Sequence, residues 1–179
     1  MQDSLLPQRV LQLPAATGRL VLWERTRPWC RVFLNQVRKT QSPGSIDPAL
    51  LVDEAVFATS FDELRATIDK HPASFVFAEV TVAHFRDLLG QIPRFRRLIP
   101  RLRIAIVCFE LPERCLDEYH VLDSLFREAG ATAVLTAQRD LLAMIPAVLT
   151  HFASFPRPEA HWRELIEQRL PWRNVGGNH

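Results

Sequence analysis

Residues 74–82 read SFVFAEVTV, and this stretch decides the fold. Its apolar run, 75–78, is continuous and does not alternate with polar residues, which is typical of a strand buried on both faces of a parallel sheet. The run ends at Glu79, a carboxylate that is costly to bury unless a neighbouring group pairs with it. Thr81 then provides the cap of a following helix. The sequence therefore predicts a buried strand with one acid at its carboxyl end.

The same alternation of short apolar runs and amphipathic stretches continues on both sides of this strand. Proline residues at positions 93 and 100 break up the basic stretch 91–103, and Pro146 predicts a kink in the last helix. The alternation predicts an α/β domain with a parallel sheet covered on both faces. We expect strands at 19–24, 55–58, 75–78, 103–109 and 132–136, and helices at 28–39, 60–70, 81–89, 116–130 and 139–152.

Acids end two of these strands, Glu24 after the first and Glu79 after the third. Ligands of such folds bind beyond the carboxyl ends of the strands, where the strand order reverses. If the order is 2-1-3-4-5, both acids point into one crevice.

Composition places the chain among ordinary globular proteins, with 179 residues, 47% hydrophobic and 23% charged. No apolar run approaches the ~20 residues of a membrane span, and the first residues lack the apolar core of a signal peptide. We therefore expect a cytoplasmic protein without membrane contact. A net charge of +2 disfavours nucleic acid as a partner, and three cysteines do not make a disulfide framework.

Three segments are predicted along the chain: a tail at 1–18, the α/β domain at 19–155, and a C-terminal amphipathic helix with a disordered end at 156–179. The C-terminal helix either folds back onto the domain or offers an apolar face to a partner. Its apolar face is formed by Trp162, Leu165 and Ile166.

Four segments together resemble the receiver domain of response regulators, over about residues 19–153. GATAVLTAQRDLLAMIPAVL (130–149) follows the receiver pattern GADDYLTKPFDLEELLARI, and SFVFAEV (74–80) follows DLVLLDI. LVLWER (20–25) follows ILIVDD, and IAIVCF (104–109) follows VIVLTA. The resemblance implies a doubly wound, flavodoxin-like five-stranded sheet in the order 2-1-3-4-5, and a regulatory role in signal transduction.

By this resemblance, the functional positions of a receiver are occupied by unsuitable residues. The phosphoacceptor position is Glu79, the magnesium-holding pair is Glu24 and Arg25, the hydroxyl position is Cys108, the lysine position is Ala137 and the switch-aromatic position is Val134. Phosphoryl transfer depends on positioning and on neutralisation of charge, and the loss of one such donor costs ~100-fold or more. We therefore expect a vestigial pocket that cannot be phosphorylated, with no metal, no cofactor and no enzymatic activity.

Two interpretations of Glu79 remain open from the sequence. In the first, its carboxylate accepts hydrogen bonds near Thr81 or pairs with Arg25 and has a structural role. In the second, the longer side chain imitates a phosphoryl group. The first is favoured because nothing left in the pocket would sense the charge.

The resemblance also implies an interaction surface on the helices at 118–129 and 139–152, which would bind a protein partner or a second copy. Its exposed members would be Tyr119, Asp123, Arg127 and Arg139, and the C-terminal helix with Trp162 offers a competing surface.

The alternative function is a small-molecule or metal-dependent enzyme that uses a crevice bounded by Glu24, Glu79 and Cys108. A vestigial crevice should instead be plugged by Trp23, by Phe109 or by an ion pair of Arg25. Cys108, Cys115 and His120 do not have the spacing of a zinc knuckle. RFRRLIPRLR (94–103) could grip phosphates, but a solvated loop and helix end explain it more simply.

Overall fold

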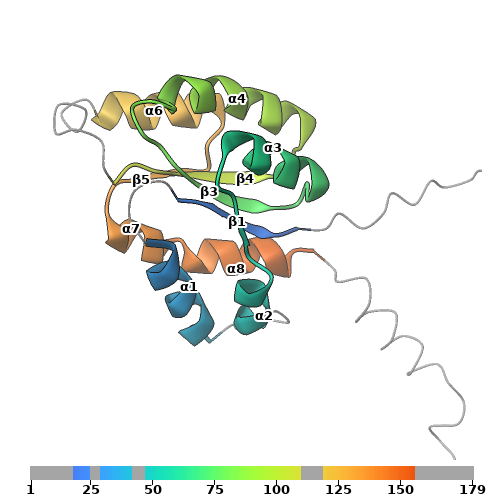
Figure 1. Cartoon of the computed structure of the whole chain (residues 1–179). Coiled ribbons are helices and arrows are strands. Elements are labelled where there is room, and N and C mark those ends of the chain that lie inside the picture. Colours follow the sequence, from blue (N-terminus) through green and yellow to red (C-terminus); the bar gives the residue numbers. More distant parts are fainter. Residues whose placement is uncertain (1–17, 25–28, 42–46, 110–118, 156–179) are drawn as a thin grey trace, which may run out of the picture. The chain divides into compact units, whose positions relative to one another are not determined.

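The computed structural model describes residues 18–24, 29–41, 47–109 and 119–155, which form a five-stranded parallel sheet between two layers of helices (Figure 1). The strand order is β2-β1-β3-β4-β5, and all neighbouring strands are parallel. This confirms the predicted fold class and strand order. The strands are β1 (Leu20–Trp23), β2 (Val56–Phe57), β3 (Phe75–Glu79), β4 (Arg103–Val107) and β5 (Ala133–Leu135).

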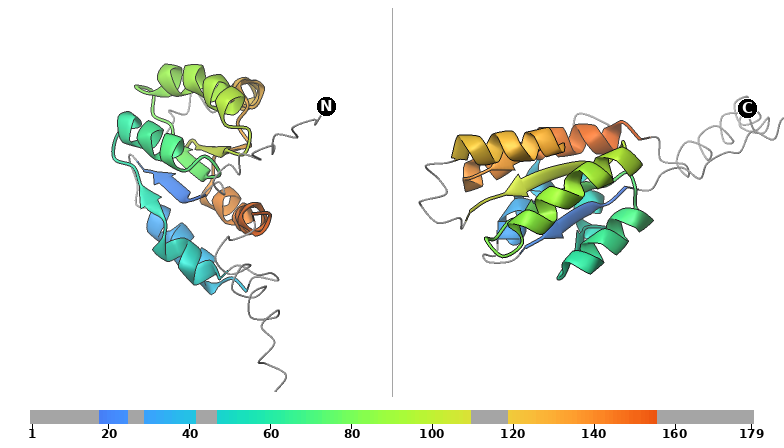
Figure 2. Two further views of the ribbon diagram at one scale, coloured as in Figure 1. Left: turned by 90° about the vertical axis from the view of Figure 1, so that its right-hand side faces the viewer. Right: turned by 90° about the horizontal axis from the view of Figure 1, so that it is seen from above.

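Helices cover both faces of the sheet, as the side view in Figure 2 also shows. One layer contains α3 (Phe61–Lys70), α4 (Phe85–Leu98) and α6 (Tyr119–Ala129). The other contains α1 (Trp29–Lys39), α2 (Pro48–Asp53), α7 (Gln138–Ala143) and α8 (Ile145–Ala153). Within the described ranges, no helix combines the length and the apolar character needed to cross a membrane.

Strand residues alternate between the two layers, which explains why the apolar runs are continuous. Val76 and Ala78 of β3 belong to the core beneath α3, α4 and α6. Phe75 and Phe77 belong to the core on the side of α1, α7 and α8. Both faces of β3 are therefore buried, and no position of this strand faces solvent.

Four local predictions differ from the structure. The helix predicted to be capped by Thr81 begins at Phe85, with His84 as its N-cap residue, and the Thr81 hydroxyl contacts Nδ1 of His84. Helix α2 lies in a stretch where no helix is predicted, and Asp47 caps its first turn.

Helix α4 continues through Pro93, which is exposed, so the carbonyl left without a partner can be hydrated. The last predicted helix is divided at Met144, and Pro146 lies in the first turn of α8, where its missing N–H costs little.

Gly130 ends α6 with a positive φ of 107°, a conformation that side chains disfavour. Its N–H donates to the Arg127 carbonyl, and the N–H of Ala131 donates to the Phe126 carbonyl. A Cβ atom at position 130 would lie 2.8 Å from Cγ of Arg96 on α4. Glycine is thus required both by the backbone turn and by the close approach of the arginine stem.

The described residues lie within one compact unit, Thr17–Phe155. The predicted tail and the predicted C-terminal helix with Trp162, Leu165 and Ile166 lie outside the described residues, as does Arg25. The predictions for these segments therefore stay predictions.

Candidate functional site

The central residue of the site, Glu79, ends β3 at the carboxyl edge of the sheet with only 1% of its surface exposed. Alternation along the strand directs its side chain to the same layer as Phe75 and Phe77. There the indole Nε1–H of Trp29 donates to Oε2 of Glu79 at 3.1 Å. A buried carboxylate requires such donors, and α1 supplies this one from its first residue.

Trp29 is itself buried and packs between aromatic side chains near Glu79. Its ring contacts Phe77 edge-to-face, with a centroid distance of 6.4 Å, and Phe109 at 6.3 Å. Phe109, one of the residues predicted to fill the crevice, therefore lies against the indole ring of Trp29. Trp23, the other aromatic candidate, is buried on the opposite face, where it contacts Phe61 and His84.

Sequence reasoning missed Trp29 as a member of the site. The sequence does contain an indication of this role. The N–H of a buried tryptophan needs an acceptor, and Trp29 follows the strand that ends next to Glu24. The direction of the side chain, however, depends on how α1 packs on the sheet.

Cys30, the residue after Trp29, lies within electrostatic range of both Glu24 and Glu79. Oε1 of Glu24 is buried and has no hydrogen-bond partner among the described residues. Burial raises the pKa of the Cys30 thiol far above its usual range, and the charge of Glu24, a hydrogen bond with Glu24 and the charge of Glu79 act in the same direction. The structure therefore brings both predicted acids to one thiol, which stays protonated.

Cys108 does not face this group. It follows β4 and belongs to the core beneath α3, α4 and α6, the face opposite to that of Glu79. Burial raises the pKa of its thiol to about 12, so it is protonated at neutral pH and a poor nucleophile. The crevice required by the alternative enzyme, with Cys108 beside both acids, is not assembled.

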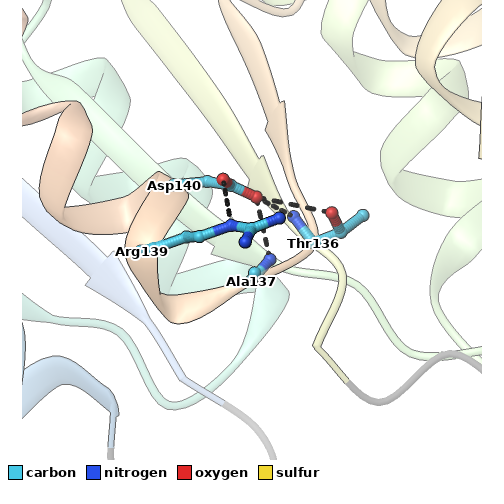
Figure 3. Close-up of polar contacts among 4 residues, drawn as sticks. All are labelled: Thr136, Ala137, Arg139 and Asp140. Carbon is cyan, nitrogen blue, oxygen red and sulfur yellow. Dashed lines mark hydrogen bonds and ion pairs between the residues drawn. The ribbon is translucent and has the colours of Figure 1, made fainter.

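Ala137, at the predicted lysine position, begins a capped helix (Figure 3). Oδ2 of Asp140 accepts hydrogen bonds from the backbone N–H of Ala137 at 3.0 Å and of Thr136 at 3.3 Å, and from the Thr136 hydroxyl at 3.4 Å. The carboxylate thereby satisfies the free N–H groups before α7. Val134, at the switch position, is buried in the same core as Cys108.

A magnesium ion of the receiver type does not fit these residues. Mg²⁺ requires several hard oxygen ligands in octahedral geometry. In the described part of the chain, no three His, Cys, Asp or Glu side chains are arranged to hold a metal. One oxygen of Glu79 already accepts a hydrogen bond from Trp29, so it is not available as a ligand without loss of that bond.

The predicted interaction residues lie on α6 and α7. Tyr119 begins α6, and Asp123 and Arg127 form an ion pair one turn apart at 2.8 Å. Arg139 of α7 lies 3.7 Å from Asp140, with 89% of its side chain exposed. Val121 and Leu125, two exposed apolar residues of α6, were not predicted as members of this surface.

Comparison with known proteins gives similarities of structure only. No protein-family model matches the sequence, and no curated protein matches it. The chain is similar to a crystal structure of a CheY-like protein (TadZ) from Pseudomonas aeruginosa PAO1, with a TM-score of 0.49, 17% identity, and coverage of 77% of this chain and 98% of that chain. It is also similar to a response regulator from Thermotoga maritima, with a TM-score of 0.47, 16% identity, and coverage of 75% and 98%.

Proposed function

We propose that the chain is a receiver-like regulatory module that is not phosphorylated and that acts by binding another protein. The observation that carries the proposal is the state of Glu79, whose buried carboxylate accepts the indole N–H of Trp29. A phosphodonor must reach the acceptor oxygen in line, which a side chain with 1% of its surface exposed does not permit.

The charges around the acceptor also support this proposal. The phosphoryl group of a receiver is balanced by a lysine, a hydroxyl and a magnesium ion. Here Ala137 occupies the lysine position, Cys108 belongs to the other core, and Glu24 adds negative charge beside Glu79. A phosphoryl group would add further negative charge without compensation. Glu79 instead has a structural role, because it connects the first turn of α1 to the end of β3.

Incubation with acetyl phosphate and Mg²⁺ is expected to leave the intact mass of the protein unchanged. A competent receiver domain treated in parallel provides the positive control. Mass spectrometry under mild conditions measures the adduct. An adduct that forms on the wild-type chain and disappears in Glu79→Gln would contradict the proposal, because it would identify Glu79 as an accessible acceptor.

The surface made by α6, β5 and the start of α7 is the proposed contact of the module with a second copy of the chain, and we call it the α6–β5 surface. Strand β5 is at the edge of the sheet, and exposed Val121 and Leu125 lie one turn apart on α6. The Asp123–Arg127 pair gives the surface a polar margin. Without a phosphoryl trigger, association through this surface is constitutive.

A Val121→Asp/Leu125→Asp variant is expected to weaken self-association of the full-length chain by about tenfold or more, because central apolar contacts dominate interfaces. Sedimentation equilibrium measures the dissociation constant. Val32→Asp, at an exposed position of α1, is the matched control and should have no effect. A charge reversal at Arg127 and Arg139 should weaken binding as well. Equal association of all variants, or a wild-type chain that stays monomeric, contradicts self-association through this surface.

A further inference from the structure

Five arginines between residues 94 and 103 divide into two sets with different roles. Arg96 and Arg103 are partly buried and donate to backbone carbonyls. Nη1 of Arg96 donates to the Leu102 carbonyl at 2.6 Å, and Nη1 of Arg103 donates to the Pro100 carbonyl at 3.4 Å. These two arginines hold the turn between α4 and β4, so their presence has a structural explanation.

The other three, Arg94, Arg97 and Arg101, are exposed. Within the described residues, none of the three forms an ion pair with a carboxylate, and Arg101 lies over the ring of Phe155 at 5.6 Å. Leu98, between them in sequence, has 66% of its surface exposed. Positions 94, 97 and 98 lie on one face of α4, and position 101 follows shortly after its end. We call Arg94, Arg97, Leu98 and Arg101 the arginine surface.

The positive charge of the chain is concentrated around this surface. Residues 85–103 contain six arginines and one aspartate, a net charge of +5, whereas the whole chain has a net charge of +2. Like charges are also crowded inside the turn: the pKa of Arg96 is lowered, first by burial and then by the charge of Arg103. Exposed positive charge at this density attracts anionic groups.

We propose that the arginine surface binds an acidic segment of a partner protein that also carries an apolar side chain for Leu98. Arginine presents a planar fork that matches a carboxylate, so exposed arginines suit acidic side chains. Leu98 supplies an apolar contact between charged neighbours, which is the usual arrangement of an anchor within a polar rim.

Other anionic partners fit this surface less well. Single-stranded nucleic acid is held by basic residues together with exposed aromatic rings, and none of the four residues of the surface is aromatic. An anionic membrane surface is bound through several apolar side chains that enter the lipid, and the arginine surface offers one leucine. The arginine surface belongs to α4 and the following turn, so it shares no residue with the α6–β5 surface. Failure of either proposal can therefore be distinguished from failure of the other.

Binding of a fluorescent peptide with a repeated Glu-Glu-Leu sequence to the full-length chain tests the proposal by fluorescence anisotropy. We expect the acidic peptide to bind and a Gln-Gln-Leu peptide not to bind, and we expect the affinity to fall as salt is added. Combined Arg94→Gln/Arg97→Gln/Arg101→Gln replacement should weaken binding by about tenfold, since each exposed ion pair contributes little alone and three are lost together.

Leu98→Ser should weaken binding of the acidic peptide by a few fold. Val82→Ser is its matched control, because Val82 has the same exposed fraction of 66% but lies before α4, and Arg139→Gln is the control for charge. All six substituted positions, the four arginines with Leu98 and Val82, are exposed, and circular dichroism checks the fold of each variant. Equal binding of the triple variant and the wild type overturns the proposal. Tighter binding of oligothymidylate or of phosphatidylglycerol vesicles than of the acidic peptide overturns it as well.

Discussion

Trp29→Ala is expected to destabilise the domain by about 3–5 kcal/mol, the largest effect of any single replacement considered for this site. The substitution removes a buried ring that contacts Phe77 and Phe109, and it also removes the N–H that donates to Glu79. The carboxylate would then be buried with one donor fewer, which adds to the cost of the cavity. Urea unfolding monitored by circular dichroism measures the change in the free energy of unfolding.

Further variants separate the contribution of the Trp29–Glu79 hydrogen bond from that of the packing of the Trp29 ring. Trp29→Phe keeps most of the apolar contact but loses the N–H, and we expect a loss of about 1–3 kcal/mol. In a Glu79→Met background, where no carboxylate needs a donor, the same Trp29→Phe replacement should cost less. Additive effects in this double-mutant cycle would show that the Trp29–Glu79 hydrogen bond contributes nothing to stability.

Restoring two receiver residues, by Glu79→Asp together with Ala137→Lys, is expected to leave phosphorylation at least ~100-fold below that of a competent receiver. The acceptor would still be buried next to Trp29, and Arg25, an expected magnesium-holding position, would still be a cation. The measurement is the fraction of adduct formed with acetyl phosphate and Mg²⁺, and Glu79→Asp alone is the matched control. If the double variant were labelled to the level of the competent receiver, Trp29 and Arg25 would not be what prevents phosphorylation.

The parts of the fold that depend on local pattern could be predicted from the sequence. Continuous apolar runs indicated buried parallel strands, and the acid at the end of SFVFAEV indicated the carboxyl edge where Glu24 and Glu79 meet. The stretch IDPALLVD also contains a helix start, because Asp47 caps α2 and Pro48 occupies its first turn, but no helix is predicted there from the sequence.

The positions that depend on register could not be predicted. Glu79 pairs with Val107, so Cys108 lies on the opposite face of the sheet from Glu79. A shift of one residue in the pairing of β3 and β4 would reverse this result, and the sequence does not fix the register. Likewise, the direction of Trp29 depends on how α1 packs, and the continuity of α4 depends on the exposure of Pro93.

The hydrogen bond between Trp29 and Glu79 has a consequence for how a receiver-like domain of this kind could be regulated. A switch needs an input that favours one of two conformations, and in a receiver that input is the phosphoryl group. In this domain Oε2 of Glu79 already accepts the N–H of Trp29 from α1, and the carboxylate is buried, so under the proposed function that input is missing. The remaining variable is the concentration of the domain relative to its dissociation constant from a partner. Such a domain would report its own abundance, and its output would be set by synthesis and degradation.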